Sequence, residues 1–202
     1  MTSIETLTLE VADVAAADRF YTAAFGPAVP LRFTSAQEPT DGFRGFTLSL
    51  VVSQPADVKA LIGAAVDAGA ATLKPVTKSL WGYGGVVRAP DGTVWKVATS
   101  AKKDKGPATR HVDQVVLLLG ATDVAASKKF YTGHGLSVAK SFGKYVEFAA
   151  ASSPVKLALY RRGALAKDAG VPPEGSGSHR LAIGDDAGSF VDPDGFEWRP
   201  AV

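Results

Sequence analysis

The two halves of this 202-residue chain contain the same two motifs in the same order. The segment VADVAAADRFYT at 11–22 is matched at seven of its twelve positions by ATDVAASKKFYT at 121–132. A second motif follows in each half, APDGTVW at 89–95 and DPDGFEW at 192–198. Two ordered matches at similar spacing indicate a duplicated module, and in such folds a ligand site often lies where the copies meet.

The composition limits the classes of function that need to be considered. Hydrophobic residues make up 46% of the chain and charged residues 21%, which is ordinary for a globular protein with a buried core. The net charge of +2 gives no argument for a nucleic-acid partner. The absence of cysteine excludes disulfides, thiolate nucleophiles and cysteine metal sites, and it fits a cytoplasmic protein.

No association with a membrane is expected from the sequence. The N-terminal segment MTSIETLTLEV has no basic region and carries two glutamates, so it does not have the pattern of a signal peptide. The longest apolar runs, such as VVLLL at 115–119, are far too short to cross a bilayer and suit buried strands better.

Each half is predicted to begin with a strand followed by a helix. Apolar and polar residues alternate over 4–11, and the run at 112–119 is its counterpart in the second half. Asp13 and Asp123 are predicted N-caps, because a short carboxylate accepts from the free N–H groups of a first helical turn. The aromatic residues repeated in these helices are interpreted as core residues: Phe20, Tyr21, Phe130 and Tyr131.

The later elements of the two halves are less alike. Further strands are predicted at 29–33, 43–52, 84–89 and 93–98, and at 136–140, 144–149, 155–160, 180–183 and 196–200. A helix is predicted at 55–70, whereas its counterpart at 163–178 is short and ends in a Pro/Gly/Ser loop. Pro-Asp-Gly forms the turn before the last strand in both halves.

The segment AKKDKGPATR at 101–110 is charged, contains glycine and proline, and shows no apolar period, so we interpret it as an exposed linker. It divides the chain into an N-terminal module at 1–100 and a C-terminal module at 111–202.

This order of elements resembles the vicinal oxygen chelate superfamily, which includes glyoxalase I, bleomycin resistance proteins and extradiol dioxygenases. The pieces DRFYTAAFG at 18–26 and KKFYTGHGL at 128–136 are similar to the helix of that superfamily, and WGYGGVVRAPDGTVWKV at 81–97 is similar to its last hairpin. The resemblance covers nearly the whole chain. It implies an α+β fold of two tandem βαβββ modules, whose curved mixed sheets form a cup.

The resemblance also implies where a metal ion would be held. Metal-using members take a ligand from the first strand and a glutamate from the last strand, usually four residues after the Pro-Asp-Gly glycine. In this chain the first-strand positions are Thr6 and Gln114, and the last-strand positions are Lys96 and Arg199. Protonated lysine and arginine offer no lone pair and repel a cation, so no metal and no other cofactor is expected.

A rearranged metal site is the alternative. A different strand register could bring Gln114, His179 and Glu197 around one divalent ion. The chain would then be a metal-dependent lyase, isomerase or dioxygenase of the same superfamily, with Glu197 as a ligand or a base. In a third interpretation, Lys96 and Arg199 only form structural ion pairs with acids such as Glu10 or Glu197.

The favoured hypothesis is a protein that binds a small, partly aromatic or anionic molecule in the cup without a metal. Cations on the cup face suit an anion, and aromatic side chains in a loop suit an organic molecule. The candidate ligand-binding residues are Trp81, Tyr83, Lys96, Arg199, Phe46 and Tyr160. No catalytic residue is assigned apart from Glu197 in the enzyme alternative, and a homodimer is left open.

Overall fold

The computed structural model describes residues 3–80, 82–150, 153–186 and 188–201. Its helices are α1 Val14–Phe25, α2 Pro55–Asp67, α3 Val124–Gly133 and α4 Arg162–Ala169, with the 3₁₀ turn η1 Gly26–Ala28. The strands of the first half are β1 Ile4–Val11, β2 Leu31–Ser35, β3 Thr40–Gly42, β4 Phe46–Val51, β5 Ala71–Ser79, β6 Gly82–Arg88 and β7 Val94–Thr99. Those of the second half are β8 Gln114–Ala121, β9 Val138–Phe142, β10 Tyr145–Phe148, β11 Val155–Arg161, β12 Gly175–Gly177, β13 Leu181–Asp185, β14 Phe190–Val191 and β15 Glu197–Pro200.

Of the antiparallel strand pairs that join the halves of the chain, β4 with β8 and β1 with β13 have the longest registers. Around the first pair the strands run in the order β5-β6-β7-β4-β8-β11-β10-β9, which we call the β4–β8 sheet. Around the second pair the order is β14-β15-β13-β1-β2, which we call the β1–β13 sheet. The two sheets join where Ile4 pairs with Val155.

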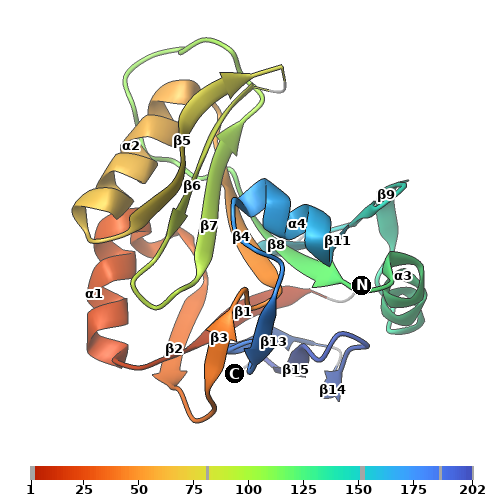
Figure 1. Cartoon of the computed structure of the whole chain (residues 1–202). Coiled ribbons are helices and arrows are strands. Elements are labelled where there is room, and N and C mark those ends of the chain that lie inside the picture. The colour runs from red at the N-terminus through yellow and green to blue at the C-terminus, as the bar shows by residue number, and fades with distance from the viewer. Residues whose placement is uncertain (1–2, 81, 151–152, 187, 202) are drawn as a thin grey trace.

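The fold class predicted from the sequence is confirmed. From β4 to β7, and again from β8 to β11, the chain passes through a strand, a helix and three strands, with the first strand parallel to the last. The result is a mixed, curved α+β arrangement (Figure 1). The boundaries at 1–100 and 111–202 stay a prediction, and both central strand pairs run across them.

Helices α1, α2 and α3 pack their buried residues on one face of the sheets, which we call the outer face. The predicted N-caps are confirmed, since Asp13 accepts from the N–H of Ala16 and Asp123 accepts from those of Ala125 and Ala126. The repeated aromatic residues belong to the core as predicted, with Phe130 half-buried and the other three buried. No helix among the described residues is long and apolar enough to cross a membrane.

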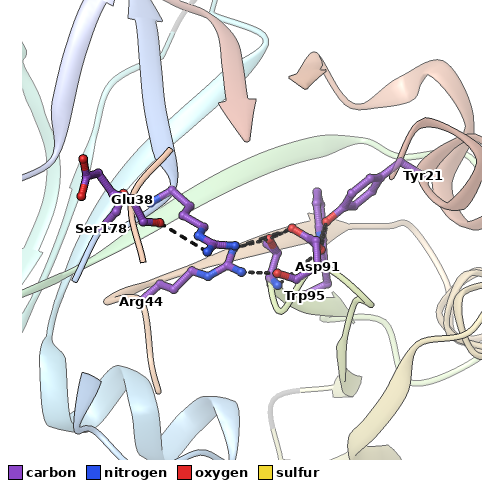
Figure 2. A network of polar contacts seen from close by, with 8 residues as sticks. Tyr21, Glu38, Arg44, Asp91, Trp95 and Ser178 are labelled. Carbon is purple, nitrogen blue, oxygen red and sulfur yellow. Dashed lines mark hydrogen bonds and ion pairs between the residues drawn. The ribbon is translucent and has the colours of Figure 1, made fainter. Parts of the chain in front are cut away.

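The duplicated motifs meet in the core through one repeated contact. In the first half, Trp95 Nε1 donates to Tyr21 Oη over 3.2 Å, and the Tyr21 hydroxyl donates to Asp91 over 2.9 Å (Figure 2). Burial and the nearby Asp91 raise the pKa of Tyr21 well above its usual value, so this hydroxyl keeps its proton and donates. Arg44 completes the cluster, with Nη1 lying 3.7 Å from Asp91 Oδ2.

The second half repeats this contact with an aspartate at a different position relative to the Pro-Asp-Gly turn. Trp198 Nε1 donates to Tyr131 Oη over 3.3 Å, and the Tyr131 hydroxyl donates to Asp192 over 2.5 Å. Asp192 precedes the Pro-Asp-Gly turn, whereas Asp91 lies within it. Both contacts therefore hold a helix that follows a strand of one sheet on a strand of the other sheet. Helix α1 lies on β7, the last strand of the first half, and α3 lies on β15, the last strand of the second half.

Strand β5 is a difference from the sequence prediction, which leaves 71–79 outside any strand. Most of its residues are exposed, it lies at the end of the strand order, and it contains Pro75. Proline lacks the N–H that a central strand donates, so it is tolerated at an edge but lowers the strand signal in the sequence.

The segment 101–110 lies outside the helices and strands and is exposed from 102 onward, and its backbone is held by the start of α2. Gln54 accepts from the N–H groups of Lys105 and Gly106. The fully buried Asp57 accepts from the N–H groups of Thr109 and Arg110 at 2.6 and 2.8 Å. Burial alone would raise the pKa of Asp57, but these hydrogen bonds outweigh it and lower the pKa.

We predict that Asp57→Asn lowers the free energy of unfolding by about 1 to 2 kcal/mol at pH 7, because hydrogen bonds to a charged acceptor become neutral ones. A carboxyl group whose pKa is lowered by folding stabilises the protein above its unfolded pKa and loses that effect as the pH falls. The deficit should therefore shrink in acid, as measured by urea unfolding at pH 7 and pH 3. Asp67→Asn, on the exposed end of α2, is the control. Equal losses in both variants would contradict the prediction.

Candidate functional site

The face of the β4–β8 sheet opposite the outer helices, here called the inner face, carries two lysines at its centre. The strand register places Lys96 of β7, Ser49 of β4, Val116 of β8 and Lys156 of β11 side by side across the sheet. In the resemblance drawn from the sequence, Lys96 occupies the position of a metal-binding glutamate.

Helix α4 follows β11 directly and lies across this inner face (Figure 1). Leu165 and Ala166, both almost fully buried, pack with Leu118 of β8. At the helix end, Ala169 packs with Val94 of β7. The chain's own helix therefore occupies the middle of the face that a ligand would otherwise fill.

Beside α4 the inner face keeps an open pocket of about 510 Å³, which we call the Tyr160 pocket. It is lined by Lys96, Leu118, Phe142, Lys144, Tyr145, Tyr160 and Asp168. The rings of Tyr145 and Tyr160 meet edge to face with centroids 6.0 Å apart, and Phe142 lies 6.4 Å from Tyr145. Phe142 is 65% exposed, which is unusual for a phenylalanine and leaves its ring available for contact.

Polar lining residues of the Tyr160 pocket take part in two ion-paired clusters. Lys96 Nζ lies 2.7 Å from Asp168 Oδ2, and both side chains are more than a third exposed. Tyr145 donates to Glu147 over 3.0 Å, and Glu147 also pairs with Lys156 at 3.2 Å. Burial and Glu147 raise the pKa of Tyr145, so its hydroxyl is a donor at neutral pH. Burial opposes the ionisation of Glu147, but hydrogen bonds from Tyr145 and Lys156 outweigh it and lower the pKa of that carboxyl.

Of the six ligand-binding residues predicted from the sequence, Lys96 and Tyr160 lie together in the Tyr160 pocket. Phe46 is buried in the outer core and reaches the edge of a separate cavity of about 410 Å³. Tyr83 packs with the outer core, with Lys59 of α2 over its ring. Arg199 belongs to the β1–β13 sheet, and Trp81 lies outside the described residues.

Five lining residues are not among the residues predicted from the sequence, namely Leu118, Phe142, Lys144, Tyr145 and Asp168. Tyr145 faces Tyr160 only because β10 pairs with β11 in this register, which composition and periodicity do not reveal. Asp168 reaches Lys96 from a segment 72 positions away. The alternation of KYVEFA at 144–149 is the one signal that could have placed Tyr145 and Glu147 on a common face.

The residues of the alternative metal site do not converge. The amide of Gln114 donates to the carbonyl of Val115. The two ring nitrogens of His179 face the carbonyl oxygens of Arg44 and Asp194, and its ring stacks on Phe196. These contacts use both nitrogens that a metal would need.

The two residues also lie far apart along β8: Gln114 is the first residue of this strand, and His179 lies beside its other end. The ring of His179 lies beside Gly45, whose carbonyl accepts from Gly120 near the end of β8, while Gln114 begins the strand. Six residues of extended strand correspond to about 20 Å. Among the residues that the structure describes, no group of three or more His, Asp or Glu side chains could hold a metal ion. The donor set therefore does not fit the divalent metal that the resemblance implies.

The β1–β13 sheet presents the corresponding face with different side chains. Thr6 pairs with Gly184, which pairs in turn with Arg199. Arg199 forms an ion pair with Glu197, as one of the sequence interpretations anticipated, whereas the partner of Lys96 is Asp168. Glu197 also lines a pocket of about 500 Å³ together with His179, but Glu197 is exposed and paired.

We predict that Leu165→Ala lowers the free energy of unfolding by about 2 to 4 kcal/mol, because a fully buried leucine on α4 leaves a cavity against the inner face. Lys167→Ala on the exposed side of the same helix is the control and should change it by less than about 0.5 kcal/mol. Urea unfolding monitored by tryptophan fluorescence measures both. A loss below about 1 kcal/mol for Leu165→Ala would show that α4 does not fill this face.

Solved structures share this fold. Glyoxalase I from Zea mays superposes with a TM-score of 0.64 at 17% identity, covering 98% of this chain and 91% of that one. A glyoxalase I variant from the same plant gives a TM-score of 0.62 at 19% identity, covering 98% and 92%. A candidate dioxygenase from Bacillus subtilis gives 0.56 at 12% identity, covering 90% and 69%. No protein-family model and no curated protein matches the chain. At these identities the likeness establishes the fold, and the resemblance inferred from the sequence is confirmed at that level.

Proposed function

We propose that this protein binds a small organic molecule with aromatic and anionic character in the Tyr160 pocket, without a metal ion, as a non-catalytic member of the vicinal oxygen chelate superfamily. The observation that carries the proposal is the convergence of Lys96 and Tyr160, predicted independently from the sequence, in one pocket of about 510 Å³. Pockets for small organic molecules commonly measure about 300 to 1,000 Å³ and combine apolar walls with few polar groups.

The aromatic lining supports an aromatic ligand. Phe142, Tyr145 and Tyr160 come from three successive strands and already contact one another through edge and tilted geometries. An aromatic ring that extends this cluster gains dispersion and quadrupole contacts of the same kind. Phe142 is exposed whereas Tyr145 and Tyr160 are half-buried, so its ring is the aromatic surface most open to a ligand.

The charge of the lining supports an anionic ligand. Lys96 and Lys144 contribute two positive charges to the pocket, and Asp168 contributes one negative charge. The excess of one positive charge attracts an anion, and a lysine ammonium provides up to three donors to its oxygens.

The proposal of metal-free binding rests on the side chains at the expected ligand positions. Lys96 stands where the resemblance places a glutamate, and Ser49, Val116 and Lys156 beside it form no anionic donor set. The lining offers groups that hold and orient a molecule, and its one carboxylate is already paired with Lys96.

Binding is tested with aromatic acids such as benzoate and phenylacetate in the presence of EDTA. We predict that at least one raises the melting temperature, because a ligand that prefers the native state stabilises it. Phe142→Ala should weaken the affinity about fivefold to tenfold, as measured by calorimetry. Leu80→Ala, which removes an 86% exposed leucine outside the pocket, should leave it unchanged. Failure of every aromatic acid to bind, loss of binding in EDTA, or equal weakening by both variants would overturn the proposal.

A further inference from the structure

Asp168 occupies an electrostatically unfavourable place in its own helix. It lies in the last turn of α4, where the free carbonyl groups carry a partial negative charge, and a carboxylate is disfavoured there. Lys74 donates to the carbonyl oxygens of Lys167 and Asp168 over 2.8 and 2.7 Å, so that ammonium group satisfies the helix end. The requirements of the helix therefore do not explain a carboxylate at this position.

The side chain of Asp168 is instead directed at Lys96 in the pocket. Its Oδ2 atom lies 2.7 Å from Lys96 Nζ, which is the distance of a charge-assisted hydrogen bond. The side chains of Lys96 and Asp168 are 35% and 44% exposed, so a molecule that enters from solvent can reach the pair. Partly exposed pairs of this kind are weak, and another carboxylate can replace the one that is present.

We propose that Asp168 is an internal competitor for the anionic group of the ligand, and that this ligand is an aromatic carboxylate whose oxygens replace those of Asp168 on Lys96. The inference rests on the proposed function and adds the chemical class of the anionic group. Lys96 already binds a carboxylate supplied by the chain, and the rings of Tyr160 and Tyr145 lie in the same pocket to receive an aromatic ring attached to such a group. An incoming acid must therefore bind Lys96 more strongly than the carboxylate of Asp168 does.

The test compares phenylacetate with phenylacetamide, its neutral analogue, by calorimetry on the wild type and on Asp168→Asn. Removal of the competing charge should raise the affinity for phenylacetate about threefold to fivefold and leave the affinity for phenylacetamide unchanged. Lys96→Met should abolish the preference for the acid over the amide. Asp67→Asn makes the same change of net charge on the exposed end of α2 and should have no effect.

The outcomes separate this inference from the proposed function. If Asp168→Asn leaves the affinity for phenylacetate unchanged, or raises the affinity for acid and amide equally, Asp168 is not a competitor although the pocket binds aromatic molecules. If Asp168→Asn lowers the melting temperature without changing affinity, the ion pair with Lys96 has only a structural role. If no aromatic acid of the binding test binds the wild type or Asp168→Asn, the proposed function itself fails.

Discussion

The contact between a helix tyrosine and a hairpin tryptophan is the interaction on which the arrangement of the two sheets depends. Tyr21 on α1, which follows a strand of the β1–β13 sheet, accepts from Trp95 in the β4–β8 sheet. Tyr131 on α3 makes the reverse connection to Trp198. Each tyrosine hydroxyl also donates to a carboxylate, so the buried tryptophan N–H and the buried hydroxyl both have hydrogen-bond partners. Leaving either group unpaired in the core would be costly. The repeated motifs thus connect the two sheets, each contact lying within one half of the chain.

The inner faces of the two sheets differ, although the tyrosine–tryptophan contact occurs in both halves of the chain. In the β4–β8 sheet, α4 covers the centre of the face and leaves the Tyr160 pocket at its side. In the β1–β13 sheet, Glu197 and Arg199 are exposed and pair with each other. A concave sheet that contains its own helix has less room than an empty cup, but the helix adds Asp168 to the wall. This difference directs our proposals to one of the two faces.

The sequence predicted the helices and strands better than the lining of the Tyr160 pocket, for physical reasons. Asp13 and Asp123 act within a single helical turn, so local chemistry was enough to identify them. Strand β5 was missed because an exposed edge strand has no buried face to produce a regular pattern. Lys96 and Tyr160 are predictable as site residues from their residue types and their positions in strands. Their neighbours Tyr145 and Asp168 depend on strand register and on the path of α4, which involve residues far apart in the chain.

The sequence by itself determined the repeated motifs, the fold class, the helix caps and the aromatic core, because each follows from spacing within a short segment or from the repetition of such segments. The tertiary structure alone decided that β1 pairs with β13 and β4 with β8, and that α4 crosses the inner face. Strand pairing and helix docking bury surface between residues that are distant in sequence, so their free energy is not encoded in any local pattern. The surroundings of Lys96 follow from those long-range contacts.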